Sequence, residues 1–205
     1  IAKKWLINKT RKGNAEGDNS NAQYAALGIR ACADAGIVFE KKVLQRALAW
    51  WEGSQWSEGG WCYKPRTSDS ESPYGSMTAG ALGSIVIYHH LLGGKWKGNR
   101  KVELGIKWVV DHWSVEKNPG GEGATATWHF YYLYALERLG ILYGTERFGR
   151  HEWYAEGARS LLKLQEETGR WCNPRNEGYR FGDTCWAILF LRRATRPLED
   201  VATKG

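Results

Sequence analysis

Apolar residues follow the 3.6-residue period of an α-helix through most of the chain, and the helical segments are of two kinds. Three have one apolar stripe and a polar back, with stripes along 44–51, 102–113 and 154–162. Four others are apolar on nearly every side: 22–35, 77–92, 127–139 and 185–191. Because a helix that is apolar all round is buried all round, these four are predicted to be inner helices that alternate with outer, one-faced ones. The pattern therefore predicts an all-α fold.

An internal duplication organises the sequence. Gln55, Trp61 and Cys62 recur in the same order and spacing as Gln165, Trp171 and Cys172. Weaker matches, such as Lys4-Trp5 with Lys107-Trp108, extend the correspondence to most of the chain. We therefore expect one domain over 1–205, made of two related units (1–98 and 101–195), each holding two helical hairpins.

Helix ends are predicted from small and polar residues. Gly36 and Gly140 are expected to terminate the first and third inner helices, as glycine commonly does just after a helix. Ser76 and either Asp183 or Thr184 are expected to cap the beginnings of the second and fourth. The segment 63–75 is a long loop rich in proline, serine and acidic residues, and we expect it to lie over a cavity mouth.

The two tryptophan segments carry a family resemblance. Residues 47–61 and 158–171 resemble the QW repeat of squalene-hopene cyclases and the related repeats of protein prenyltransferases. The resemblance implies an α/α toroid in which Gln55, Gln165, Trp61 and Trp171 are structural, the glutamine capping a helix end and the tryptophan stacking nearby. Toroids of this family close with more than four hairpins. The chain is thus expected to be part of a larger or assembled toroid, meeting a protein partner, a second copy or another part of its own protein along its open edges.

Composition narrows the function classes. The net charge is +7, but the basic residues are scattered and no basic run interleaves with aromatics, so nucleic-acid binding is not expected. No apolar stretch reaches the roughly 18 to 20 residues that span a bilayer. The chain begins at Ile1 inside an expected helix (2–7), which is typical of a piece of a longer protein. The 12 tryptophans and 25 glycines indicate aromatics packed over tight loops, or an aromatic-lined cavity.

The catalytic motifs of the resembled family are missing. The sequence holds neither the DxDD acid of protonating cyclases nor a magnesium-binding DDxxD cluster. Asp183 and Cys185 match the first half of the prenyltransferase zinc site, although an Asp183 helix cap and a packed Cys185 explain them more simply. No CxxC pair occurs, and no cofactor is expected.

Three acids are the remaining catalytic candidates. Asp18, Glu122 and Asp183 each precede or begin an inner helix, so a toroid would gather them at one end of its cavity. Paired carboxylates there would suit a carbohydrate-active enzyme. Capping of helix ends is the simpler interpretation.

Aromatic residues of the inner helices are the candidate ligand contacts, since their faces stack on sugars or enclose apolar groups. The candidates are Tyr24, Trp128, His129, Tyr132 and Trp186. The first functional hypothesis is a ligand-binding or interaction module without an intact catalytic motif. The others are a carbohydrate-active α/α-barrel enzyme and an isoprenoid enzyme fragment that lacks part of its site.

Overall fold

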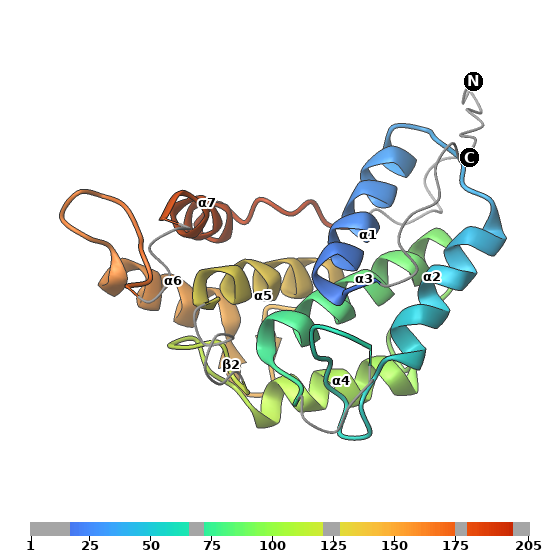
Figure 1. Ribbon diagram of the computed structural model, residues 1–205, viewed down its shortest axis with the longest axis horizontal. Coiled ribbons are helices and arrows are strands. Elements are labelled where there is room, and N and C mark those ends of the chain that lie inside the picture. Colours follow the sequence, from blue (N-terminus) through green and yellow to red (C-terminus); the bar gives the residue numbers. More distant parts are fainter. Residues whose placement is uncertain (1–16, 66–71, 121–127, 175–179, 199–205) are drawn as a thin grey trace.

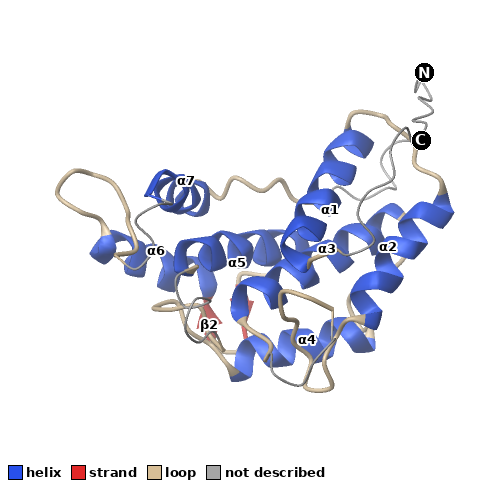
Figure 2. Ribbon diagram, viewed as in Figure 1, coloured by secondary structure: helices blue, strands red, loops and turns tan. Residues whose placement is uncertain are grey.

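The computed structural model describes residues 17–65, 72–120, 128–174 and 180–198 (Figure 1). These ranges hold seven helices: α1 (Asn19–Asp34), α2 (Lys41–Gly53), α3 (Gly75–Leu91), α4 (Arg100–Asp111), α5 (His129–Tyr143), α6 (Trp153–Leu164) and α7 (Arg180–Leu191). The strands are a two-residue antiparallel pair, β1 (Arg147–Phe148) and β2 (His151–Glu152). The predicted all-α fold is confirmed (Figure 2). The expected helix over 2–7 lies outside the described residues.

Two sets of helices alternate along the chain. Helices α1, α3, α5 and α7, which we call the inner row, pack one against the next in that order. The other three pack against the inner row: α2 and α4 on α3, and α6 on α5 and α7. Figure 1 shows α3 and α5 in the middle of the molecule and α2, α4 and α6 at its periphery. The alternation follows the sequence order of one-faced and all-round apolar segments.

Burial differs between the middle and the ends of the inner row. Residues 75–88 of α3 are all buried, and so is most of α5. In contrast, Phe181 and Ile188 of α7 are 90% and 45% exposed, and Tyr24 of α1 is 42% exposed. The two end helices have an inner-row neighbour on one side only, so part of their surface faces solvent. Within the described residues, no helix is long and apolar enough to cross a bilayer.

A segment that follows α7 connects the two ends of the inner row (Figure 1). The guanidinium of Arg30 in α1 donates to the carbonyl oxygens of Arg196 and Pro197 at 2.6 and 2.8 Å. Thr195 donates from its hydroxyl and its backbone N–H to the carboxylate of Glu137 in α5. The segment therefore lies against the C-terminal halves of α1 and α5.

Some expected helix ends were wrong. α5 continues past Gly140 to Tyr143 and ends at Gly144, which has a φ of 76°. Gly140 is instead a contact point, because a Cβ there would lie 2.4 Å from the indole of Trp153. At the other ends, Tyr74 rather than Ser76 precedes α3, and α7 begins at Arg180, so that Asp183 lies in its first turn.

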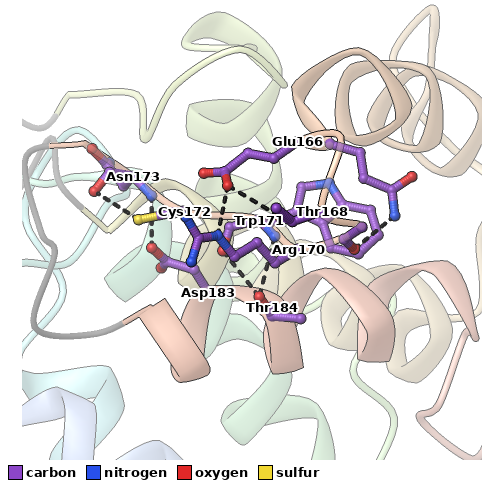
Figure 3. A network of polar contacts seen from close by, with 10 residues as sticks. Glu166, Thr168, Arg170, Trp171, Cys172, Asn173, Asp183 and Thr184 are labelled. Atoms are coloured by element: carbon purple, nitrogen blue, oxygen red, sulfur yellow. Dashed lines mark hydrogen bonds and ion pairs between the residues drawn. The ribbon is translucent and has the colours of Figure 1, made fainter.

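The two tryptophan loops form the same hydrogen bonds. Trp61 donates from its indole to the carbonyl of Trp51 at 2.8 Å, as Trp171 does to that of Leu161. Their backbone N–H groups donate to the hydroxyls of Thr78 and Thr184 at 3.0 and 3.1 Å. Each tryptophan thus ties an outer helix, through its indole, to the next inner-row helix, through its backbone N–H. Figure 3 shows the second loop, with Trp171 and Thr184 side by side.

The glutamine of each loop follows an outer helix and bonds the same turn. Gln55 and Gln165 donate from their side-chain amides to the carbonyls of Gly59 and Gly169, at 3.0 and 2.8 Å. Gln55 also donates to the carbonyl of Lys101 in α4 at 2.8 Å. The side-chain amides therefore close the turns after α2 and α6, and in the first loop also bind the following outer helix.

Candidate functional site

A cavity of about 480 Å³ lies where the first two turns of the four inner-row helices come together. Its volume is within the range of roughly 300 to 1,000 Å³ that is usual for small-molecule sites. The described wall is mostly aromatic and consists of Ser20, Tyr24, Tyr63, Tyr74, Ser76, Met77, Trp128, Tyr131 and Trp186. Tyr63 and Tyr74 come from the described ends of the loop 63–75, which was expected at a cavity mouth.

Specific hydrogen bonds hold the helix beginnings at the cavity. Asp18 caps α1 by accepting from the N–H of Asn21 at 2.8 Å. Asn19 fastens this end to the Trp61 loop, because its side chain donates to the carbonyl of Cys62. At α3, the side chain of Asn118 accepts from the N–H of Ser76 at 2.8 Å. The beginnings of α1 and α3 are therefore held in place at the cavity wall.

The aromatic rings of three helices contact one another across the wall. Tyr131 of α5 lies at the centre, with its ring centroid 5.1 Å from that of Trp186 in α7 and 6.3 Å from that of Tyr24 in α1. Trp128 packs edge-on against both Tyr131 and Trp186, with centroids 6.2 Å away in each case. These spacings are those of attractive aromatic pairs.

A hydrogen-bond chain runs from this wall into the protein. The guanidinium of Arg138 donates to Gln23 Oε1 at 2.6 Å, and Gln23 Nε2 donates to the hydroxyl of Tyr131 at 2.6 Å. That hydroxyl is also 3.0 Å from Ser20 Oγ. Arg138 and Gln23 are 3% and 2% exposed, so the chain connects a buried cation to the cavity surface.

The hydroxyls of Tyr63 and Tyr131 are protonated at neutral pH. Burial raises the pKa of Tyr131 to about 12. Burial also raises the pKa of Tyr63, and the nearby carboxylate of Asp18 raises it further. Neither tyrosine ionises under ordinary conditions, and the described wall residues include no carboxylate or cationic side chain. The described wall is therefore neutral and offers hydroxyl groups among aromatic faces.

The structure separates the five aromatic candidates into two groups. Tyr24, Trp128 and Trp186 line the cavity. His129 and Tyr132 do not contribute to the described wall: the imidazole bonds the carbonyl of Val115 at 2.9 Å, and the Tyr132 ring is 1% exposed. Apart from Glu137 and Arg138, the residues of α5 are apolar, aromatic or glycine, so the sequence of this helix gives little indication of which face meets the cavity.

Several wall residues are not among the five ligand contacts predicted from the sequence. Tyr131 is the most central of them, and its three-residue spacing from Trp128 places both on one helix face. Ser76 and Met77 lie in the first turn of α3, where nothing in the sequence marks them as cavity residues. Recognising them requires knowing which helix ends meet.

The acids and the half-site for zinc lie in separate surroundings. Asp18 caps α1 near Tyr63, whereas Asp183 accepts from the N–H of Asn173 at 2.8 Å (Figure 3). Burial raises the pKa of Asp183, whose other carboxylate oxygen has no hydrogen-bond partner among the described residues. Cys185 is exposed, and no cluster of three metal-binding side chains occurs in the described residues. Glu122 lies outside them.

Comparison of the chain with models of protein families, with curated proteins and with solved structures gives no match.

Proposed function

We propose that this chain is a ligand-binding repeat domain of the squalene cyclase-like and prenyltransferase-like class, and that it binds a small organic molecule in the aromatic cavity. The observation that carries the proposal is the cavity itself: about 480 Å³, at the beginnings of all four inner-row helices, with Tyr24, Trp128, Tyr131 and Trp186 among its walls. Largely apolar cavities with a few converging polar groups are the usual form of a small-molecule site.

The chemistry of the wall supports binding rather than catalysis. General acid–base chemistry needs groups whose pKa lies near the working pH, and the Tyr131 hydroxyl, at about 12, stays protonated. Hydrolysis of a glycosidic bond needs two carboxyls roughly 5 to 10 Å apart across the substrate. In the described residues Asp18 lies near the wall beside Tyr63, while Asp183 is buried against Asn173. The aromatic faces are suited to stacking and to dispersion contacts.

Titration with N-phenyl-1-naphthylamine, a neutral dye that fluoresces in apolar surroundings, tests the proposal. We expect one saturable site whose affinity for the dye falls about tenfold in Trp186→Ala. A tenfold loss corresponds to about 1.4 kcal/mol, which is the size expected when one aromatic stacking contact and its buried apolar area are removed. Trp96→Ala is the matched control, since Trp96 bonds the carbonyl of Tyr143 and is not among the described wall residues. Its affinity should stay within about twofold of the original.

Two results would contradict the proposal. One is the absence of saturable fluorescence with the folded chain. The other is an equal loss of affinity in the Trp186 and Trp96 variants, which would place the dye elsewhere.

A further inference from the structure

We propose that the cavity selects neutral ligands that carry a hydrogen-bond acceptor oxygen beside a flat apolar face, and that it disfavours cations. The inference rests on the proposed function, because it names the ligand class of the same cavity. It comes from the direction of the hydrogen-bond chain Arg138–Gln23–Tyr131–Ser20, which we call the donor chain.

The direction of the donor chain is fixed at its buried end. A guanidinium has N–H donors and no acceptor, so the Gln23 atom that lies 2.6 Å from Arg138 is the carbonyl oxygen. The other end of the same amide is then the NH₂ group. It donates to the Tyr131 oxygen at 2.6 Å, and the tyrosine is an acceptor at that contact.

The cavity end of the donor chain has one hydroxyl proton more than its internal hydrogen bonds use. Ser20 and Tyr131 carry one hydroxyl proton each, and their mutual contact of 3.0 Å uses one of them. Gln23 supplies its own proton, so it accepts none from the pair. Among the described residues no other group accepts from this pair, so one hydroxyl proton remains for the cavity, whichever of the two residues presents it. An acceptor on the ligand, such as a carbonyl, ether or hydroxyl oxygen, takes this proton, whereas an apolar atom at the same point leaves it unpaired.

Packing prevents Gln23 from turning away. The residue is 2% exposed, and its amide lies directly against the backbone of α3 at Gly80. A Cβ at Gly80 would be 2.4 Å from Gln23 Oε1, so the amide occupies the space that the missing side chain leaves. Rotation of this amide would also bring its NH₂ group against the Arg138 donors. The donor chain is consequently held in one orientation.

Electrostatics act in the same sense against cations. Arg138 is 3% exposed. Among the described residues it has no ion pair, and its Nη1 has no hydrogen-bond partner. Its guanidinium lies 4.0 Å from the ring centroid of Tyr134 and 5.8 Å from that of Tyr24, which forms part of the cavity wall. A positive charge behind a wall of low polarity repels a cation that enters the cavity. An aromatic cavity alone would attract such cations. The Asp18 carboxylate beside Tyr63 also favours them, but it lies at a partly exposed helix end, where water screens its charge more than that of the buried Arg138.

The test uses three probes of similar shape in competition with N-phenyl-1-naphthylamine. They are 2-acetylnaphthalene, which offers a carbonyl oxygen, 2-isopropenylnaphthalene, in which a CH₂ replaces that oxygen, and the cation N,N,N-trimethyl-2-naphthylammonium. The measured quantity is the ratio of the alkene Kd to the ketone Kd, compared between variants so that the different hydrophobicity of the probes cancels. The cation should bind the original chain more weakly than the alkene.

Two variants remove the spare proton in different ways. In Gln23→Glu the carboxylate pairs with Arg138 and accepts from Tyr131, so the proton count at the cavity falls by one while the shape is kept. In Ser20→Ala/Tyr131→Phe both hydroxyls are absent. If Gln23→Glu does not fold, this second variant tests whether the preference for the ketone depends on the hydroxyl proton. We expect the ratio to fall about fivefold in each, the value for one ordinary hydrogen bond. Tyr143→Phe is the matched control, because that hydroxyl bonds Glu103 outside the described wall.

The outcomes separate this inference from the proposed function. If no probe displaces the dye, or the dye itself does not bind, both fail. If the probes bind but the ratio is the same in the original chain and the folded variants, or the cation binds more tightly than the alkene, the cavity binds ligands without the selectivity inferred here. Gln23→Glu should also improve cation binding, because its carboxylate neutralises Arg138, and an unchanged cation affinity would overturn the electrostatic part.

Discussion

Each tryptophan loop presents a side chain whose removal should be costly, and Trp61 is the more enclosed of the two. It is 0% exposed, and its indole donates to the carbonyl of Trp51 at 2.8 Å. A tryptophan side chain buries on the order of 200 Å², which at about 25 cal/mol per Å² corresponds to about 5 kcal/mol. Partial collapse of the site reduces that figure. We therefore expect Trp61→Ala to lower the free energy of unfolding by about 3 to 5 kcal/mol.

The hydrogen bond can be separated from the ring. Trp61→Phe keeps most of the apolar contact but removes the indole donor to Trp51. Because Ser54 still donates to that carbonyl at 3.2 Å, the loss should be about 0.5 to 1.5 kcal/mol. Trp171 is 4% exposed and forms the equivalent bond to Leu161, so Trp171→Ala should also cost about 3 to 5 kcal/mol. Similar losses in the two loops would show that the second loop contributes to stability as the first one does.

Urea titration followed by far-UV circular dichroism is the appropriate assay, because the chain has 12 tryptophans and their fluorescence mixes many sites. The slope of the free energy with urea should stay unchanged, so that shifts in midpoint report stability. Leu162→Ala is the control: this residue of α6 is 63% exposed and should change the free energy by less than about 0.5 kcal/mol. Losses below about 1 kcal/mol in both alanine variants would refute the reasoning. If Trp61→Ala does not fold, the phenylalanine variant and Trp171→Ala decide.

Two further predictions concern charge and association. Burial raises the pKa of Glu137 above its usual 4.5, so the stability from its protonation is present below that value and lost as pH rises through the folded-state pKa. The free energy of unfolding of the original chain minus that of Glu137→Gln should therefore be larger at pH 4 than at pH 7 in urea titrations, and a constant difference would contradict this. We also expect the chain to self-associate through α7, where Phe181 is 90% exposed. Light scattering should give a mass above 23.2 kDa that Phe181→Ser lowers, whereas a 23.2 kDa species of the original chain would argue against it.

Local sequence determined the helices and their alternation. Helix α2 corresponds to the apolar stripe through Leu44 and Trp51, and α3 corresponds to the all-round apolar segment 77–92. The 3.6-residue period of apolar positions shows whether a helix is buried on one side or on every side. The period alone does not specify the helix ends. Gly140 and Gly144 are both suitable stops after an apolar run, and only packing of Trp153 against Gly140 shows that the helix continues through the first of them.

The candidate site was decided by tertiary structure. Trp128 and His129 are neighbours in the sequence, yet one lines the cavity and the other bonds Val115. Because α5 is apolar or aromatic on nearly every side, its pattern carries no directional signal, and its orientation is set by α3 and α7 on either side. Gln23 and Arg138 come from opposite halves of the chain, and each is unremarkable alone. Their contact exists only because α1 and α5 both pack on α3, and this contact gives the cavity its hydrogen-bond donor.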